Sequence, residues 1–298
     1  MGESSAEQLY RGARIALLTQ HGKERVLAPL FASGLGAQLV VADGFDTDTL
    51  GTFTREVDRA GTQLEAARRK AEIAIELSGA DIGLGSEGAF VPGPFGLGSW
   101  NIEALVLVDR VRGIEIIGRA GAAGRHLHGS VATLAELVAF ATRAGFPEHG
   151  LVLRPNDERD PRVVKGINTQ AALEKAFETA FEKAFEQAFE QAVRHATGGV
   201  VFVENDLRAH LNPTRMASIG EAGRDLVARM KCACPACGLP GFGAVGQVPG
   251  LPCRDCGAPT RQPVAEEFGC VRCEHREERP LRDAAESADP AVCDYCNP

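Results

Sequence analysis

The first 231 residues contain no cysteine, and all nine cysteines lie between Cys232 and Cys296. The chain also lacks an apolar run of membrane-spanning length, and its start, MGESSAEQLYRGAR, has no apolar segment of the kind that directs secretion. The net charge of −8 gives no overall attraction to nucleic acid or to anionic membranes. These absences predict a cytoplasmic protein, bound to no membrane, whose cysteine-rich end is a separate domain.

Strands alternate with helices over the cysteine-free part, which predicts an α/β domain. The segment TQLEAARRKAEIAIELSGAD is the clearest helix, because Thr62 and Glu65 can form a capping box and Gly79 stops the apolar periodicity. Helices are also predicted at 24–33 (closed by Gly34), 134–145 and 212–230 (capped by Asn212), and strands at 14–19, 37–43, 81–90, 150–155 and 198–206, with a hairpin over 104–120.

A low-complexity segment carries a phenylalanine at every fourth position, at Phe177, Phe181, Phe185 and Phe189. This spacing advances about 400° around an α-helix, so the stripe drifts slowly and predicts a core-facing helix. The domain organisation that we predict is a disordered tail (1–13), an α/β domain (14–203), a junction with a linker helix (204–231) and the cysteine-rich domain (232–298).

Eight of the nine cysteines form four Cys-x-x-Cys pairs, separated by gaps of 15, 13 and 19 residues. Two such pairs complete a tetrahedral site for one structural Zn²⁺, so the tail predicts two zinc sites, with Cys232 outside both. The ligands are Cys234, Cys237, Cys253, Cys256, Cys270, Cys273, Cys293 and Cys296. We expect sequential pairing of neighbouring Cys-x-x-Cys units, since short loops close easily, although interleaved pairing is stereochemically possible.

The cysteines have three other interpretations. Disulfides suit a secreted chain, and one Cys-x-x-Cys pair could carry out redox chemistry. Iron–sulfur ligation uses the same ligand type and also stays open. Residues 231–298 hold 7 Lys/Arg against 10 Asp/Glu, which argues against a nucleic-acid-binding ribbon. We therefore expect a structural or a protein-contacting role for this module, and the chain could also form a homodimer.

The first predicted strand ends in a polar turn, Thr19 to Lys23, that opens a helix. Helix N-termini with glycine and lysine nearby bind phosphate groups, and the alternative is an ordinary strand-to-helix loop. Two later segments bear on the choice. Glu65 and Lys70 lie five apart on the clearest helix, and Asp81 and Glu87 lie in a glycine-rich strand.

In this order and spacing, residues 14–120 resemble the inosine/xanthosine triphosphate pyrophosphatase (ITPase-like) superfamily. The resemblance rests on the turn with Thr19, His21 and Lys23, on EAARRKA from Glu65, and on Ala-Asp followed by Glu-Gly at 80–81 and 87–88. It implies a long mixed sheet with a cleft between two lobes, and Mg²⁺- or Mn²⁺-dependent cleavage of a nucleoside triphosphate. The segment VVKGINTQAALEKAF is similar to a late lysine-containing segment of the family, which implies that Lys165 lies near the base.

The implied catalytic residues are Glu65, Asp81 and Glu87, with Glu65 and Glu87 as magnesium ligands. The implied substrate-binding residues are Thr19, His21, Lys23, Lys70 and Lys165, and the polar cluster VENDLRAHLNPTRM adds His210 and Arg215. His21 replaces a family asparagine and Lys23 comes early. The segment VPGPFGLGSWN is an insertion, which we interpret either as a lid or as a segment that reshapes the substrate pocket.

Each of these residues also has a structural reading. In this interpretation Glu65 only completes the capping box, Lys70 lies on a solvated face of its helix, and Asp81 caps the end of a strand. Glu87 is harder to explain in this way, because a buried carboxylate needs a partner. His126 and His128 in RHLHG are read as a solvated loop. The second functional hypothesis is therefore a binding or adaptor protein that recognises a phosphorylated ligand without turnover and contacts a partner through its zinc module.

Overall fold

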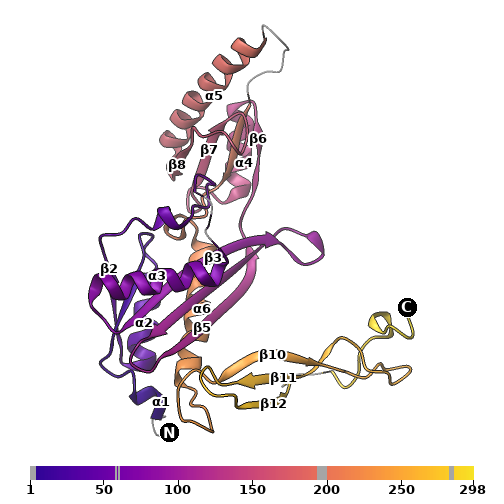
Figure 1. Ribbon diagram of the computed structural model, residues 1–298. Coiled ribbons are helices and arrows are strands. Elements are labelled where there is room, and N and C mark those ends of the chain that lie inside the picture. The colour runs from indigo at the N-terminus through magenta and orange to yellow at the C-terminus, as the bar shows by residue number, and fades with distance from the viewer. Residues whose placement is uncertain (1–4, 58, 60, 193–199, 282–284) are drawn as a thin grey trace.

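The computed structural model describes residues 5–57, 59, 61–192, 200–281 and 285–298. The chain forms two α/β lobes, one above the other in Figure 1, and a cysteine-rich module beside the lower lobe. The first lobe holds both the N-terminal segment and the last long helix, so the chain leaves this lobe, builds the second one and returns.

A mixed five-stranded sheet is the centre of the first lobe, in the order β2-β1-β3-β4-β5. Strands β2, β1 and β3 are parallel, and β3, β4 and β5 form an antiparallel meander. The strands are β1 (Arg14–Leu18), β2 (Gln38–Ala42), β3 (Ile82–Pro92), β4 (Ser99–Asp109) and β5 (Ile114–Gly124). The α/β class and the mixed sheet are thus both confirmed.

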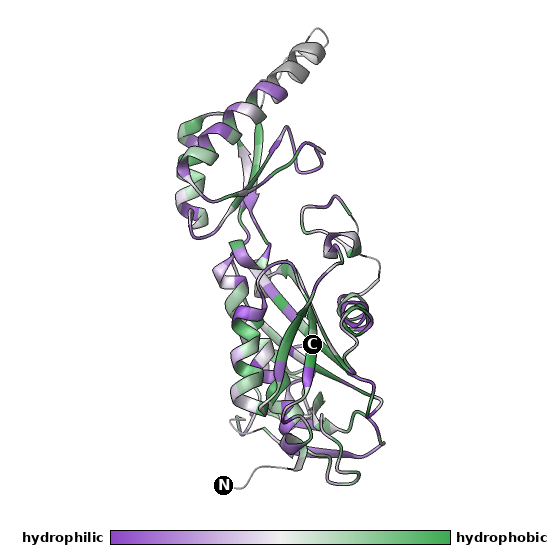
Figure 2. Ribbon diagram, turned by 90° about the vertical axis from the view of Figure 1, so that its left-hand side faces the viewer, coloured by the Kyte–Doolittle hydropathy of each residue, from purple (hydrophilic) through white to green (hydrophobic). Residues whose placement is uncertain are grey.

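Helices cover both faces of this sheet, with α3 (Gln63–Ser78) on one side and α2 (Glu24–Leu35) and α6 (Pro213–Lys231) on the other. Two glycines of β3 allow α3 to lie close, because a side chain at Gly83 or Gly85 would collide with the α3 backbone. In Figure 2 the strands are largely hydrophobic. The core between sheet, α2 and α6 includes Leu27, Phe31 and Leu226, each fully buried.

The second lobe is a four-stranded sheet, β6-β9-β7-β8, packed against two helices. The strands are β6 (His128–Val131), β7 (Leu151–Pro155), β8 (Val164–Ile167) and β9 (Val201–Asn205), and the helices are α4 (Leu134–Ala144) and α5 (Gln170–Ala192). The core-facing phenylalanine stripe is confirmed at Phe177, which is buried, and at Phe181, which packs against the core. Phe185 and Phe189 lie outside the residues whose side chains are described.

Several predicted boundaries were wrong. Residues 5–13 are not a disordered tail, because Ser5–Gln8 form helix α1 and Tyr10 is fully buried in the core. Helix α2 does not stop at Gly34 but continues to a left-handed Gly36. A side chain at Gly34 would meet Val227 of α6 at 2.6 Å, so that glycine serves close helix packing. Helix α6 is a covering layer of the first lobe, not a linker.

The cysteine-rich module contains three antiparallel strands, β10 (Gly243–Pro249), β11 (Pro263–Gly269) and β12 (Arg276–Pro280). Little apolar surface is buried here, and its small cluster comprises Phe242 and Phe268 with cysteine side chains. A module with so small a core depends on its cysteine clusters for stability.

Candidate functional site

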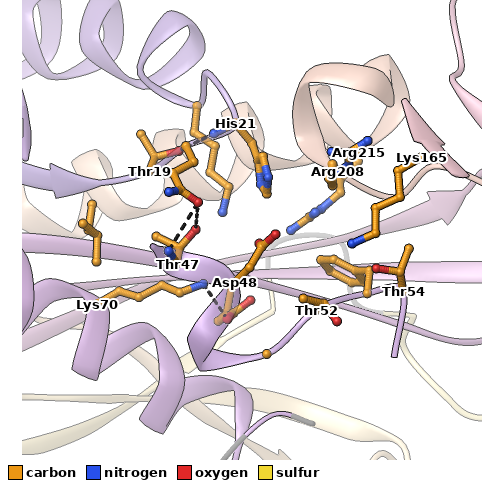
Figure 3. Close-up of a pocket in the computed structure, with 16 residues that line it drawn as sticks. Thr19, His21, Thr47, Asp48, Thr52, Thr54, Lys70, Lys165, Arg208 and Arg215 are labelled. Carbon is orange, nitrogen blue, oxygen red and sulfur yellow. Dashed lines mark hydrogen bonds and ion pairs between the residues drawn. The ribbon is translucent and has the colours of Figure 1, made fainter. Parts of the chain in front are cut away.

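The turn after β1 forms the base of a pocket between the two lobes (Figure 3). Gly22 adopts a left-handed φ of 68°, which turns the chain sharply before α2 begins at Glu24. The His21 amide donates to Thr19 Oγ1 at 3.3 Å and stiffens this turn. Lys23 then stands at the N-cap of α2 and sends its side chain into the protein.

Lys23 is a buried cation that is 5% exposed. Its Nζ donates to the carbonyl and the hydroxyl oxygen of Ser86, each at 3.2 Å, and within the described parts of the chain no ion pair to a carboxylate is formed. Burial, assisted by the positive charges of Arg215 and Lys70, lowers the pKa of Lys23 to about 7. A buried ammonium with only neutral partners is costly unless an anion joins it.

Lys70 and Glu87 form a buried ion pair opposite Lys23, with Lys70 Nζ 2.8 Å from Glu87 Oε1. Arg59 adds a second cation 3.8 Å from Glu87 Oε2. Burial alone would raise the pKa of Glu87, but Lys70 and Lys23 together hold it below its ordinary value. Glu87 therefore stays ionised and orients Lys70 toward the pocket.

Three more cations reach the pocket, from α6, from β8 and from the segment after β9, and each is held by one carboxylate. Arg215 Nε lies 2.7 Å from Glu103 in a fully buried pair, and its guanidinium lies over the ring of Phe53, 4.3 Å from the centroid. Lys165 pairs with Glu56, and Arg208 Nη2 lies 2.6 Å from Asp206. The pocket lining thus has five cationic side chains against two acidic ones, Asp48 and Glu87.

A strap of residues 51–57 closes the pocket and ties the lobes together. Arg55 binds Glu204 of β9 at 3.2 Å, and buried Arg154 of β7 donates to the carbonyl oxygen of Thr54. Under the strap about 40 Å³ remains open, which is room for a few water molecules. A nucleotide needs more room than this, so the walls of the pocket must move to admit one.

Two histidines stack at the edge of the pocket. The rings of His21 and His210 have centroids 5.1 Å apart and are tilted by 23°. Burial and the charge of Lys23 lower the pKa of His21 to about 3, and burial with the charge of Arg208 lowers that of His210. Both imidazoles are therefore neutral at pH 7.

Most of the cleft residues expected from the sequence come together. Seven of them line this single pocket: Thr19, His21, Lys23, Lys70, Glu87, Lys165 and Arg215. His210 lies beside His21 without lining the pocket itself.

Two expected catalytic carboxylates do not join them. Glu65 is fully exposed and completes the capping box of α3, accepting from the Thr62 amide at 2.7 Å. Asp81 is exposed just before β3 begins, whereas Glu87 is buried in the middle of that strand. The expected lid is also absent from this pocket, because VPGPFGLGSWN extends the β3–β4 hairpin instead.

The sequence reasoning missed the contribution of the loop that follows β2. The pocket is also lined by Thr47, Asp48, Thr52 and Thr54. Figure 3 shows the Asp48 side chain between Lys70 and the three cations Lys165, Arg208 and Arg215. The signal in the sequence was an acidic, threonine-rich stretch, GFDTDTLGTF, which reads as a turn. Only the fold brings it over the end of β1.

The pocket as it stands does not fit a magnesium site. Mg²⁺ takes oxygen ligands from carboxylates, but Glu87 is engaged by two cations and Glu65 lies elsewhere. Within the described residues, the groups of three or more Asp, Glu, His or Cys side chains that could hold a metal are the two cysteine clusters.

Each cysteine cluster can hold one Zn²⁺. The first comprises Cys234, Cys237, Cys270 and Cys273, and the second Cys253, Cys256, Cys293 and Cys296. Their close sulfur pairs lie 3.6–3.9 Å apart. A zinc–sulfur bond of about 2.3 Å in a tetrahedron gives sulfur separations of about 3.8 Å, whereas a disulfide needs about 2.05 Å. The arrangement is consistent with zinc ribbons, and Cys232 belongs to neither cluster.

The expected sequential pairing was wrong, because the clusters interleave. Strands β10 and β11 are antiparallel, so the start of β10 at Gly243 lies against the end of β11 at Gly269. This register brings the first Cys-x-x-Cys unit to the third, while β12 carries the chain back so that the fourth meets the second. Strand pairing, rather than loop length, decides which cysteines meet.

A family model described as "Domain of unknown function (DUF6671)" matches residues 70–298. The match spans Lys70, Glu87, Lys165, Arg215 and both cysteine clusters, and begins after the Thr19–Lys23 turn. No curated protein and no solved structure matches the chain. Among the described residues, no helix combines the length and the apolar character needed to span a membrane.

Proposed function

The chain belongs to the DUF6671 family, and we propose that its interlobe pocket binds the phosphate groups of a nucleoside triphosphate or related phosphorylated ligand and hydrolyses it. The observation that carries the proposal is Lys23, a buried ammonium whose described partners are neutral oxygens. A phosphate beside Lys23 would supply the missing negative charge. Lys70 and Arg215 would then contact the same group from either side.

The ITPase-like resemblance supports this proposal at the level of the residues that share the pocket. Of the positions on which that resemblance rests, Thr19, His21, Lys23, Lys70 and Glu87 line the pocket, whereas Glu65 and Asp81 do not. A nucleotide pyrophosphatase or phosphohydrolase of this type would use the lysines and Arg215 to stabilise charge on the phosphoryl group.

Asp48 is the side chain in the pocket best suited to activate a water molecule. Its carboxylate forms no ion pair within the described part of the chain, unlike Glu87, and it faces the cations across the pocket. A carboxylate held within reach of a water molecule can act as a general base, taking the proton of that water as it attacks the phosphorus of a phosphoanhydride.

The second candidate is binding without turnover, with the zinc module contacting a protein partner. The lack of a carboxylate cluster for Mg²⁺ in the pocket favours it. Turnover separates the two candidates.

The test measures phosphate and pyrophosphate release from a panel of nucleoside triphosphates, with and without Mg²⁺ or Mn²⁺. We expect activity that falls by at least 100-fold in Lys23→Met and in Asp48→Asn, by loss of charge stabilisation and of the base. Arg119→Ala, an exposed β5 arginine outside the pocket, is the matched control. Saturable ligand binding without release supports the adaptor candidate, and absence of both binding and release refutes the proposal.

A further inference from the structure

One edge of the first-lobe sheet is left open by the described strands. β2 is the outermost strand, on the side away from the cysteine-rich module, and among the described strands it pairs with β1 alone (Figure 1). The Gln38 amide points toward β1, where it donates to the carbonyl oxygen of Ala13 at 2.8 Å. Backbone groups alternate in direction along a strand, so the amides and carbonyls of Leu39 and Val41 point away from β1. These four groups can pair with another strand.

The opposite edge of this sheet and the outer edge of the cysteine-rich sheet are protected, whereas β2 is not. The amide of Arg119 in β5 donates to Asp225 Oδ2 at 2.9 Å, so α6 occupies part of that edge. β12 reads Arg-Glu-Glu-Arg-Pro, and its charges discourage a further strand. β2 reads Gln-Leu-Val-Val-Ala and pairs with β1 in an unbroken register. It therefore lacks the charges, the proline and the bulge by which proteins usually block an open edge.

Apolar side chains accompany these free backbone groups. Val41 is 38% exposed, and Leu39 and Val40 are half-buried, whereas the neighbouring strand β1 is buried after its first residue. A strand added at this edge would cover apolar surface on β2, and such burial favours association. Backbone pairing and apolar burial thus point to the same occupant, an extended strand with apolar residues.

Helix α2 leaves this edge accessible. Its residues Leu30 and Gly34 lie against α6, which covers β4 and β5. Ala28 and Ala32 are about half a turn around the helix from these positions, so they face the opposite way, toward the β2 edge. Their methyl groups are too short to shield the strand. A partner can therefore approach both the strand and the helix.

Charge is distributed unequally along the edge. Arg14 is exposed at the start of β1, in register with Gln38 at the start of β2, and Asp43 is exposed directly after the end of β2. Within the described parts of the chain neither charge forms an ion pair, and the two stand at opposite ends of the strand pair. An antiparallel copy of β2 would bring its acidic end to the basic start of this one. A parallel copy would bring like charges together.

We propose that β2 pairs with β2 of a second copy of this chain, antiparallel about a two-fold axis at Val40, so that two five-stranded sheets join into one. In this register Leu39 of each copy exchanges two backbone hydrogen bonds with Val41 of the other. The α2 helices approach along Ala28 and Ala32, which extends the contact beyond the strands. The self-complementary charges at the two ends favour a second copy over an unrelated peptide.

Sedimentation equilibrium of the intact, metal-loaded chain tests the pairing. We expect a dimer of twice the 31.6 kDa chain mass. Val41→Lys should raise the dissociation constant roughly 100-fold, because a two-fold interface contains the substitution twice and each copy costs about tenfold. Val111→Lys is the matched control, since Val111 is 67% exposed in the turn between β4 and β5, and it should leave the dimer unchanged.

A charge exchange identifies the antiparallel register without altering the apolar surface. Arg14→Glu and Asp43→Arg should each weaken the dimer several-fold, and the double variant Arg14→Glu/Asp43→Arg should restore it. These two residues stand at opposite ends of the strand pair, so the recovery must come from contacts between copies. A chain that stays monomeric at its highest soluble concentration, a dimer unchanged by Val41→Lys, or a double variant no tighter than the single ones would overturn the proposal.

Discussion

At the scale of single residues, the most informative group is Lys23. Lys23 is 5% exposed, and its burial, with the nearby charges of Arg215 and Lys70, outweighs the opposite effect of Glu103 and Glu87, so the folded protein binds the Lys23 proton less tightly than the unfolded chain does. The pKa falls from 10.5 to about 7. Such strongly shifted groups gather at functional sites, although structural ion-pair networks also shift pKa values.

This shift predicts a pH dependence of stability. Between about pH 7 and 10 the unfolded chain holds a proton on Lys23 that the folded protein has released, so stability rises with pH over that range. Lys23→Met removes this contribution. We expect the melting temperature of the native protein to improve relative to that of the variant as the pH rises from 7 to 9. A difference that does not change with pH would contradict the burial of a charged lysine.

Arg215 and Glu103 give a second prediction at this scale. Their side chains are 1% and 0% exposed, so removing one partner leaves an uncompensated buried charge. Glu103→Leu should lower the free energy of unfolding by about 3–5 kcal/mol, and the double variant Glu103→Leu/Arg215→Met should recover much of that loss. Chemical denaturation measures both. A double variant no more stable than Glu103→Leu would show that the pair itself is needed.

At the scale of elements, helix α3 was predictable because its signals are local. Thr62, Glu65 and Gly79 mark its ends in the sequence, and the structure begins and ends the helix there. The strap and the post-β2 loop were not predictable in this way. Their contacts, such as Arg55 with Glu204, join residues 149 positions apart, and no local pattern records such a pairing.

The capping box gives Glu65 a structural role, and variants can test whether Glu65 also contributes to ligand binding. Thr62→Ala should cost about 1 kcal/mol of stability, because an N-terminal amide of α3 loses its acceptor. Glu65→Gln keeps a cap acceptor and should leave ligand binding at the wild-type level, whereas Glu87→Gln should weaken it by releasing Lys70. Calorimetric titration with a nucleoside triphosphate makes the comparison. A large loss of affinity in Glu65→Gln would return that residue to the site.

At the scale of the whole molecule, the sequence indicated which residues matter better than how they meet. The cysteine-rich domain and its eight ligands followed from spacing alone, whereas most of the pocket residues followed from the family resemblance. The interleaved cysteine pairing did not, because it depends on the register of β10, β11 and β12. The position of Asp48 likewise depends on how the loop after β2 folds over β1.

The interleaved module predicts two zinc ions per chain by elemental analysis. Cys270→Ser should empty the first cluster and make the second lose its metal faster to a chelator, because the β11–β12 connection is then no longer anchored. Cys232→Ser, outside both clusters, is the matched control. Iron in place of zinc, or a second site unaffected by Cys270→Ser, would contradict this account.

The central claim is that a phosphate group belongs beside Lys23 in the interlobe pocket. The most direct measurement is a crystal structure of the full chain with a non-hydrolysable nucleoside triphosphate. The account predicts phosphate oxygens within hydrogen-bond distance of Lys23 Nζ and the Arg215 guanidinium, with the strap displaced to admit the ligand. Density for the phosphates elsewhere, with the interlobe pocket closed and unchanged at saturating ligand, would contradict it.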